Sequence, residues 1–462
     1  MSTASHQNSI NPATEETLAS FEINTENQIQ LALEKSEKTF KTWRRETFSK
    51  RAALMKKAAE YLRFNKTRFS EIMTAEMGKP IVESEAEVEK CAWNLDYYAE
   101  NAEYHLKADI RNSDATESFI QYTPLGVILA IMPWNYPFWQ VFRFAAPALM
   151  AGNTALLKHA SNVPQCAKGI EEVFRESGFP EGAFQALLVP GSGVATIIEH
   201  PVIAAVTITG SEFAGSIVAS NAGRALKKTV MELGGSDPFI VLEDADLGLA
   251  VKAGILARYQ NTGQSCIAAK RFIIVESVFD EYLDRFVDAV KTLEVGDPMN
   301  RSTQIGPLAR PEFVADLERQ VQSTIHQGAK VVAGGQPCAG KGYYFQPTVL
   351  TNVLPDMTAG CEEVFGPVAA MIRARTTEDA IQLANRTPYG LGSSLWTSDI
   401  ASAKKLARTI EAGQVFINGI VASDPRLPFG GVKQSGYGRE LSELGIREFV
   451  NIQTVWIGPK KQ

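Results

Sequence analysis

The sequence predicts an α/β fold, because short apolar runs alternate with helical segments over most of its 462 residues. One alternating series begins at Gly126, and a second begins at Pro238 and continues to about residue 430. The runs are apolar throughout, which is typical of parallel strands that helices cover on both faces. A chain of this length is expected to form two or three domains.

Residues 1–110 are expected to be mainly helical after a short start. Apolar residues from Ile29 to Trp43 recur on one helical face, and Thr25-Glu26-Asn27-Gln28 is typical of a capping box. The first α/β series predicts strands at 127–132, 155–158, 186–189, 204–209 and 229–233, and helices near 138–151, 164–177, 192–199 and 212–224. The second predicts strands at 238–242 and 271–275, and helices near 246–260, 278–293 and 311–328. Outside both series, 118–122 and 447–457 resemble strands.

Composition argues against several classes of function. The net charge is −6 and no long basic run occurs, which disfavours nucleic acid and anionic membranes as partners. Residues 1–12 are polar and do not resemble a signal or transit peptide. The uncharged stretch 123–142 contains three prolines, so we expect a buried strand, a loop and a helix start there, and no membrane span. We therefore expect a cytoplasmic protein.

Five widely spaced cysteines include no CxxC pair and no Cys/His cluster with zinc spacing, which fits a reducing compartment without disulfides or structural metal. Cys266 lies in a polar, glycine-containing loop, where a side chain is more often exposed than in a core. Lys270 and Arg271 could favour its thiolate, the nucleophilic form. A buried, inert thiol is the alternative, and the loop alone leaves both open. The other four cysteines are expected to be buried and inert: Cys91, Cys166, Cys338 and Cys361.

Two polar residues stand where chemistry is plausible. Glu232 ends an apolar strand beside two glycines, where partial desolvation would suit a general base, although a surface glutamate is the alternative. Asn135 lies in an aromatic loop, where its amide could donate to an oxyanion; an Asx turn or a helix N-cap is the alternative. Asn135, Trp139 and Arg143 are spaced to share one helical face. Arg143 would need an anionic partner there, and spacing alone favours an internal carboxylate over that of a substrate.

The usual GxGxxG dinucleotide fingerprint is absent. Gly210-Ser211 follows a predicted strand and opens a predicted helix, and helix N-termini favour phosphate. An ordinary strand-to-helix turn explains the same pattern.

Taken together, the motifs resemble those of the aldehyde dehydrogenase superfamily. The similarity extends from Asn11-Pro12-Ala13-Thr14 to the terminal strand, and the pieces occur in the family's order. They are Pro133-Trp134-Asn135, Gly152-Asn153-Thr154, Gly210-Ser211, Glu232-Leu233-Gly234-Gly235, Gly263-Gln264-Ser265-Cys266, Glu363-Val364-Phe365-Gly366-Pro367 and Pro428-Phe429-Gly430-Gly431. One such motif would be weak evidence, whereas seven in order are specific.

The resemblance implies three regions. A Rossmann-like cofactor domain would comprise 1–107 and 125–235, and an α/β catalytic domain would follow at 236–432. A small β oligomerisation flap would comprise 108–124 and 433–462. Such a flap implies a homodimer or a dimer of dimers. The family binds its pyrophosphate in a nonstandard way, which accounts for the missing glycine fingerprint.

The family's mechanism is then expected of this chain's own residues. The Cys266 thiolate would attack an aldehyde carbon, while the Asn135 amide and the Cys266 backbone N–H hold the oxyanion. Transfer of hydride to the nicotinamide would leave a thioester, and Glu232 would activate water to release the acid. The resemblance places Glu363 at the nicotinamide ribose and Phe365 near the ring. It places Trp134, Gly210 and Ser211 elsewhere in the cofactor site, and it implies no metal.

The choice between NAD and NADP is expected to depend on the residues at the end of the predicted strand 155–158, which Ser161 follows. NAD-preferring relatives commonly carry a glutamate at this position, where it binds both ribose hydroxyls. A serine leaves room for a 2′-phosphate, which Lys158 beside it would attract. We therefore expect NADP to be preferred, with NAD accepted less well.

Substrate choice depends on Arg143, because this chain resembles succinate-semialdehyde dehydrogenases in placing an arginine there. Ser423 would add a hydrogen bond to the carboxylate, and Trp139 would line the site. Phe144 replaces a lysine that is common in the family, which leaves that lysine's role in doubt. The expected reaction is oxidation of succinic semialdehyde to succinate. Alternatives are another short aldehyde such as glutarate semialdehyde, a thioester-forming acyltransferase, or a crystallin-like structural protein.

Overall fold

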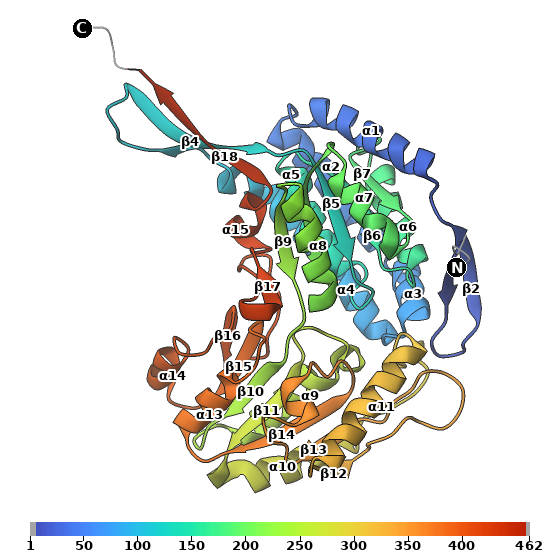
Figure 1. Cartoon of the computed structure of the whole chain (residues 1–462), viewed down its shortest axis with the longest axis vertical. Coiled ribbons are helices and arrows are strands. Elements are labelled where there is room, and N and C mark those ends of the chain that lie inside the picture. The colour runs from blue at the N-terminus through green and yellow to red at the C-terminus, as the bar shows by residue number, and fades with distance from the viewer. Residues whose placement is uncertain (1–5, 459–462) are drawn as a thin grey trace.

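Two open α/β sheets and a protruding three-stranded sheet form the architecture of the computed structural model, which describes residues 6–458 (Figure 1). The α/β class is therefore as predicted. Residues 1–5 and 459–462, at the ends of two expected domain ranges, lie outside the described residues. Within 6–458, no helix is both long enough and apolar enough to span a membrane.

The first sheet has six strands in the order β17-β9-β8-β5-β6-β7. Five of them are parallel, and β17 pairs antiparallel with β9. Because β5 neighbours both β6 and β8, the direction of strand order reverses between β5 and β8. In such sheets, ligands bind at the carboxyl ends of the strands beside this reversal. The strands are β5 (Val127–Met132), β6 (Thr154–His159), β7 (Phe184–Leu187), β8 (Ile203–Thr209), β9 (Lys228–Glu232) and β17 (Gly436–Tyr437).

Both faces of this sheet are buried, as its apolar strands predict. In β5, Ile128 and Ala130 belong to one core cluster, whereas Val127 and Leu129 belong to another. Opposite faces of one strand therefore pack against different helices. The helices are α1 (Glu26–Trp43), α2 (Phe48–Phe64), α3 (Lys66–Met77), α4 (Ile81–His105), α5 (Trp139–Met150), α6 (Pro164–Glu176), α7 (Val194–Glu199) and α8 (Glu212–Arg224).

The second sheet has seven strands in the order β12-β13-β14-β11-β10-β15-β16, and only β12 runs antiparallel to its neighbour. Its strands are β10 (Asp237–Val241), β11 (Ala269–Val275), β12 (Lys330–Ala333), β13 (Thr348–Thr351), β14 (Val368–Ala374), β15 (Gly392–Trp396) and β16 (Gln414–Ile417). Its helices are α9 (Leu247–Tyr259), α10 (Glu276–Val290), α11 (Pro311–His326), α12 (Thr358–Cys361), α13 (Thr377–Asn385) and α14 (Ile400–Leu406). Cys266 lies in the connection from α9 to β11.

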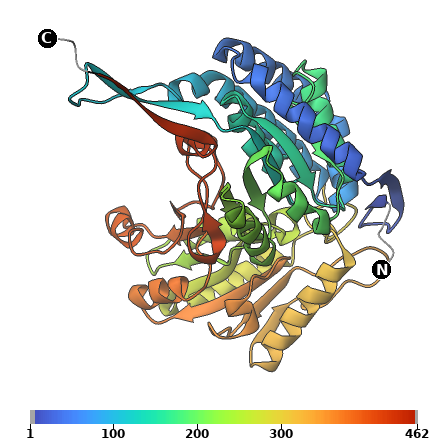
Figure 2. The same ribbon diagram turned by 45° about the horizontal axis from the view of Figure 1, so that its top comes forward.

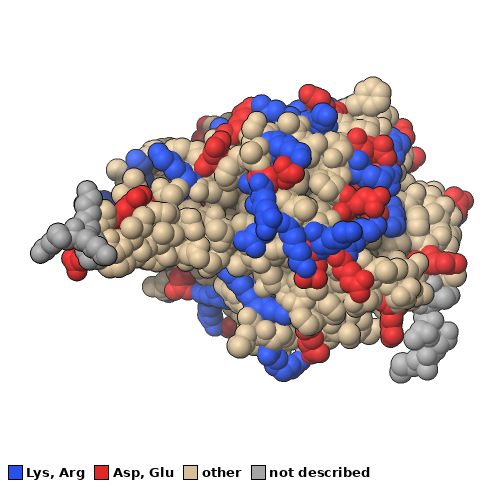
Figure 3. Space-filling model, turned by 90° about the horizontal axis from the view of Figure 1, so that it is seen from above, with Lys and Arg blue, Asp and Glu red and all other residues tan. Residues whose placement is uncertain are grey.

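A three-stranded sheet extends away from both α/β bodies, as Figures 1 and 2 show. It consists of β3 (Asp109–Ile110), β4 (Glu117–Pro124) and β18 (Val450–Ile457) in the order β18-β4-β3. The side of this arm seen in Figure 3 carries few charged side chains, whereas lysine, arginine, aspartate and glutamate are mixed over the body. A separate hairpin, β1 (His6–Ile10) with β2 (Thr17–Glu22), precedes the first helix.

Most predicted elements are present, and the differences have local causes. The capping box at Thr25 and Gln28 is confirmed, and β5 spans 127–132 as predicted. The strand expected at 186–189 begins earlier, at Phe184, because its pairing with β6 starts there. The segment 447–457 was expected to be one strand, but residue 447 ends helix α15 (Ser442–Arg447), and the strand begins only at Val450. The expected flap boundary at 433 also differs from the strand pairing, because β17 extends the first sheet and only β18 joins the arm.

Candidate active site

Cys266 lines two separate cavities, one of about 350 Å³ and one of about 150 Å³. The larger cavity lies beyond the carboxyl ends of β5 and β8, at the reversal of strand order, and includes Trp134, Asn135, Gly210 and Ser211. The smaller cavity lies on the other side of the sulfur, between α4, α5 and the loop before Phe429. A reacting atom bound to this sulfur could therefore contact groups held in both cavities.

The loop that carries Cys266 has a constrained backbone. Asn261, Thr262 and Gly263 all have positive φ, at 54°, 56° and 73°. Such conformations cost non-glycine residues about 1–3 kcal/mol each and persist where surrounding contacts hold them. The Asn261 amide donates to the carbonyls of Asn135 and Gln264, at 2.8 and 3.0 Å. Position 263 requires glycine, since a Cβ there would lie 2.4 Å from a backbone oxygen of residue 366. The position of the sulfur is therefore set by buried contacts.

The Cys266 thiol is buried, with 9% of the residue exposed, so the expectation of an exposed loop side chain is wrong. Burial, followed by the Glu232 carboxylate beside it, raises the pKa of the thiol well above its usual range. The positive charges of Arg143 and Lys270 act in the opposite direction but do not prevail. Arg271 points elsewhere and donates to backbone carbonyls of residues 236, 383 and 384. The thiolate expected in the free protein is therefore not favoured, and the thiol needs a proton acceptor.

Glu232 is placed to be that acceptor. It ends β9 with 1% of the residue exposed, so the surface-glutamate interpretation is wrong. Its Oε2 accepts a hydrogen bond from Arg143 Nη2 at 3.2 Å. Its Oε1 is buried and has no hydrogen-bond partner among the described residues. One oxygen is therefore anchored, and the other remains able to accept a proton.

Arg143 has the internal carboxylate partners that its spacing favoured. It lies within α5 with 1% of the residue exposed, and its Nε is 2.6 Å from Glu440 Oε2. Arg143 forms a second ion pair with Glu232. Its guanidinium also lies 4.5 Å from the ring centroid of Phe429. Burial raises the pKa of Glu440 to about 7, although Arg143 acts to lower it. Glu440 was not predicted as a site residue, because it lies in a loop far along the chain, without a recognisable motif.

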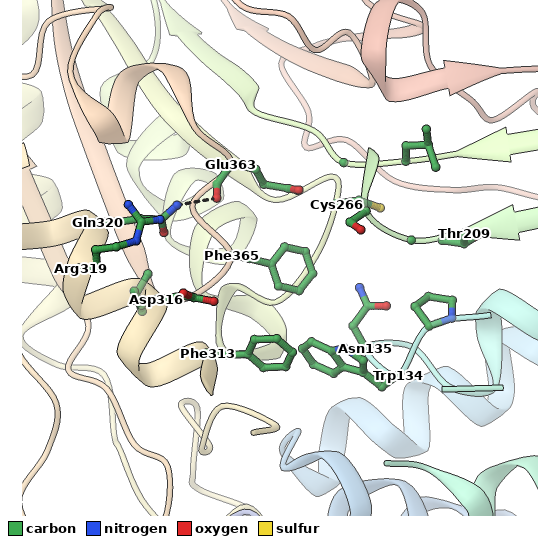
Figure 4. A pocket seen from close by; sticks show the side chains of 16 residues that line it. Trp134, Asn135, Thr209, Cys266, Phe313, Asp316, Arg319, Gln320, Glu363 and Phe365 are labelled. Atoms are coloured by element: carbon green, nitrogen blue, oxygen red, sulfur yellow. Dashed lines mark hydrogen bonds between the residues drawn. The ribbon is translucent and has the colours of Figure 1, made fainter. Parts of the chain in front are cut away.

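Asn135 faces the same cavity as Cys266 in Figure 4. Its Nδ2 donates to the Gln264 carbonyl at 3.1 Å, which orients the carboxamide. The side chain does not cap a helix, because Phe138 is the N-cap of α5 and receives no side-chain cap bond. The capping interpretation is therefore wrong, and the amide remains a candidate donor near the sulfur.

The expected cofactor residues divide into two groups. Five of them line the larger cavity: Trp134, Gly210, Ser211, Glu363 and Phe365. The Trp134 ring stacks on Phe313 at 4.9 Å and meets Phe365 edge-on at 5.8 Å (Figure 4). Glu363 accepts from the Gly235 N–H at 3.0 Å and pairs with Lys270 at 3.2 Å. Ser211 caps α8. Phe313 was missed because a lone aromatic at a helix start carries no cofactor signal.

Lys158 and Ser161 lie at the carboxyl end of β6 and do not line that cavity. Ser161 is exposed and Lys158 is half-buried, with its pKa lowered by burial. Over the described part of the chain, no carboxylate lies within ion-pair distance of Lys158. A partly desolvated cation beside an open position is suited to binding a phosphate.

The smaller cavity brings together the three expected substrate residues, Trp139, Arg143 and Ser423. It also contains Lys90 of α4, whose Nζ donates to Ser423 Oγ at 2.9 Å. Lys90 was missed because charged residues at helical spacing usually indicate a solvated face, whereas Trp139 of α5 and Ser423 contact this one and leave it half-buried.

The remaining cysteines differ in environment. Cys91 and Cys166 are buried as expected, but Cys338 is half-buried and Cys361 is exposed, so the expectation is wrong for these two. All five cysteines are free. Within residues 6–458, no group of three or more His, Cys, Asp or Glu side chains is arranged to hold a metal ion.

Comparisons with known proteins agree with the motifs and with this geometry. The model of the aldehyde dehydrogenase family matches residues 1–455. A probable NADP(+) succinate-semialdehyde dehydrogenase of Synechocystis is 53% identical over 97% of this chain and 99% of its own. An NADP(+) succinate-semialdehyde dehydrogenase of Mycobacterium avium is 50% identical over 98% and 97%. The structure of succinic semialdehyde dehydrogenase from Streptococcus pyogenes with NADP+ has a TM-score of 0.96 at 38% identity, covering 98% of this chain and 100% of that one. The chain belongs to the aldehyde dehydrogenase family.

Proposed function

We propose that this protein oxidises succinic semialdehyde to succinate and reduces NADP. One observation carries the proposal: Cys266 lies between two cavities. The larger is at the reversal of strand order in the first sheet, and the smaller contains cationic and hydroxyl groups. The first suits a nicotinamide cofactor, and the second suits a short aldehyde with a carboxylate. Relatives about 50% identical are named for this reaction.

The chemistry begins with transfer of the Cys266 proton to Glu232 as the sulfur bonds the aldehyde carbon. The Asn135 amide and the Cys266 backbone N–H would stabilise the negative oxygen, and one such donor is worth about 3–4 kcal/mol. When bound, the oxidised nicotinamide supplies the acceptor for the hydrogen and electron pair that leave the carbon. Cys266 then carries a thioester. Glu232, once its proton has left, would activate the water that releases succinate.

The residues of the larger cavity fit a nicotinamide dinucleotide. Gly210 and Ser211 at the start of α8 would bind its pyrophosphate. Glu363 would accept from the nicotinamide ribose, and Trp134 and Phe365 would pack near the ring. We assign the 2′-phosphate to Lys158 and Ser161, since an exposed hydroxyl beside an unpaired cation favours NADP over NAD.

The smaller cavity supports a short acidic aldehyde. Trp139 would pack on the carbon chain, while Ser423 and the positive charge of Arg143 would face the carboxylate. The buried Glu232 beside the sulfur supports hydrolysis of the thioester over its transfer to another thiol. The pair of cavities supports catalysis over a purely structural role.

The test is reduced-nicotinamide absorbance with succinic semialdehyde, glutarate semialdehyde and butanal, each with NADP and with NAD. We expect succinic semialdehyde with NADP to give the highest kcat/KM and Cys266→Ala to abolish turnover. Equal kcat/KM for butanal and succinic semialdehyde, or a preference for NAD, would contradict the corresponding part of the proposal.

We also propose a cytoplasmic homodimer or dimer of dimers that assembles through the arm. Ile452, Trp456 and Ile457 of β18 are 61%, 53% and 46% exposed, which is unusual for large apolar side chains on a strand. Five free cysteines support a reducing compartment. Light scattering should give a mass of two or four chains, and Trp456→Glu should lower it, whereas a wild-type monomer would exclude this assembly.

A further inference from the structure

We propose that Lys90, together with Ser423, recognises the carboxylate of the aldehyde substrate. This inference rests on the proposed function, because it identifies the cation that selects a semialdehyde with an acidic end. Lys90 lies in the middle of α4 and reaches the cavity of about 150 Å³ that also contains Cys266. Its Nζ is 2.9 Å from Ser423 Oγ and 4.4 Å from the centroid of the Trp139 ring. Neither contact neutralises its charge.

The carboxylates near Lys90 already have hydrogen-bond or ion-pair partners. Glu83, which lines the same cavity, accepts from the Asn261 N–H at 2.7 Å, and burial raises its pKa to about 7. Glu87 pairs with Lys79 and accepts from the backbone N–H groups that open α5. Asp424 pairs with Arg426 at 2.6 Å. Over residues 6–458, no carboxylate lies within ion-pair distance of Lys90 Nζ. A half-buried ammonium with only a hydroxyl and an aromatic face is placed to receive an anion from outside the protein.

Arg143 is a weaker candidate for this task, although it lines the same cavity. Its guanidinium is held by Glu232 and by Glu440, so two buried carboxylates offset one positive charge. A third carboxylate at Arg143 would therefore meet less net positive charge than one at Lys90. Arg143 positions Glu232 and adds its remaining positive charge to the cavity, whereas Lys90 supplies the cation that no protein carboxylate offsets. Ser423 accepts from Lys90, which leaves the hydroxyl hydrogen free to donate to the same carboxylate.

The environment of Lys90 makes its charge sensitive to pH. Burial, and then the charge of Arg143, lower the pKa of Lys90 to about 8, while Cys91, Glu87 and Asp424 act in the opposite direction. The ammonium form prevails below pH 8 and is lost above it. A bound carboxylate favours the ammonium form, so binding of the acidic substrate and protonation of Lys90 promote each other.

The experiment compares succinic semialdehyde with butanal, which has four carbons as well but carries a methyl group in place of the carboxylate. We expect Lys90→Met to lower kcat/KM about 10- to 100-fold for the semialdehyde, mainly through KM, and less than about 3-fold for butanal. Lys90→Arg should recover part of the loss. Lys57→Met, which removes an exposed lysine of α2, is the matched control and should change neither value. Equal losses for both substrates, or no loss, would overturn the assignment.

A second measurement needs no variant and decides the matter if Lys90→Met does not fold. In the wild type, the ratio of kcat/KM for succinic semialdehyde to that for butanal should fall as pH rises through about 8. Deprotonation of Cys266 affects both substrates and cancels in this ratio. Ionisation of Glu83 and Glu440, whose pKa values burial raises to about 7, would lower the ratio around pH 7, so the fall that reports on Lys90 is the separate one near pH 8. A ratio that stays constant from pH 6.5 to 9.5 would overturn the role of Lys90. A wild-type enzyme without preference for the semialdehyde at any pH would instead refute the proposed function itself.

Discussion

Glu440→Gln should make the protein more stable in alkaline solution while leaving its stability unchanged in acid. Glu440 is buried, and its pKa is raised from its ordinary 4.5 to about 7, mainly by burial and despite Arg143. A group with a raised folded-state pKa contributes stability that is complete below its unfolded pKa. That contribution is lost as pH rises through the folded pKa. The window for this loss is therefore about pH 4.5 to 7.

The size of the effect follows from the same values. The difference between 4.5 and about 7 corresponds to roughly 3 kcal/mol, at about 1.4 kcal/mol for each pH unit. A glutamine imitates the protonated acid and can still accept from Arg143. For 462 residues, the entropy of unfolding is about 1 kcal/mol per kelvin. We therefore expect the variant to melt roughly 3 °C above the wild type at pH 8.5 and at the same temperature near pH 4.5.

The assay is scanning calorimetry of both proteins at a fixed scan rate from pH 4.5 to 9. Glu443→Gln, at an exposed position only three residues away, is the control and should follow the wild type throughout. A Glu440→Gln curve that runs parallel to the wild type, or lies below it at alkaline pH, would refute the argument. Such a result would mean that the attraction between ionised Glu440 and Arg143 offsets the free-energy cost of burying the Glu440 carboxylate.

Three further predictions concern the cofactor, the loop and the thiol. Ser161→Glu should lower kcat/KM for NADP by about 10-fold or more relative to NAD, because a carboxylate repels the 2′-phosphate, and an unchanged ratio would place that phosphate elsewhere. Gly263→Ala should destabilise the protein by about 2 kcal/mol or more, because φ is positive there and a Cβ would contact backbone oxygen. Gly191→Ala meets no atom within 4 Å and should be neutral in the same unfolding experiment. Iodoacetamide should label Cys266 slowly at pH 7 and faster as pH rises towards 10, because the pKa of its thiol is raised. Peptide mass spectrometry separates it from the exposed Cys361, and fast labelling at pH 6 would contradict the raised pKa.

The sequence by itself determined the class of fold, most of its elements and the principal candidate residues. Apolar runs such as 127–132 become buried strands because their side chains are apolar on both faces of the strand. Such a strand is stable only in a sheet that other elements cover on both sides. Motifs such as Gly263-Gln264-Ser265-Cys266 were informative because they combine unusual backbone requirements with a reactive side chain. The alternation could not predict the antiparallel addition of β17, a two-residue pairing too short to leave a pattern.

Only the tertiary structure decided the electrostatics of the site. Arg143 pairs with Glu440, and Lys90 reaches the smaller cavity, because α4, α5 and the loop before α15 meet there. Burial likewise reversed the expected state of Cys266: Lys270 lies close and lowers the pKa of the thiol, but the loss of solvation raises it by more, and Arg271 points away to other backbone carbonyls. Periodicity reports which face of an element is buried, whereas the charge of a buried group depends on partners that distant segments supply.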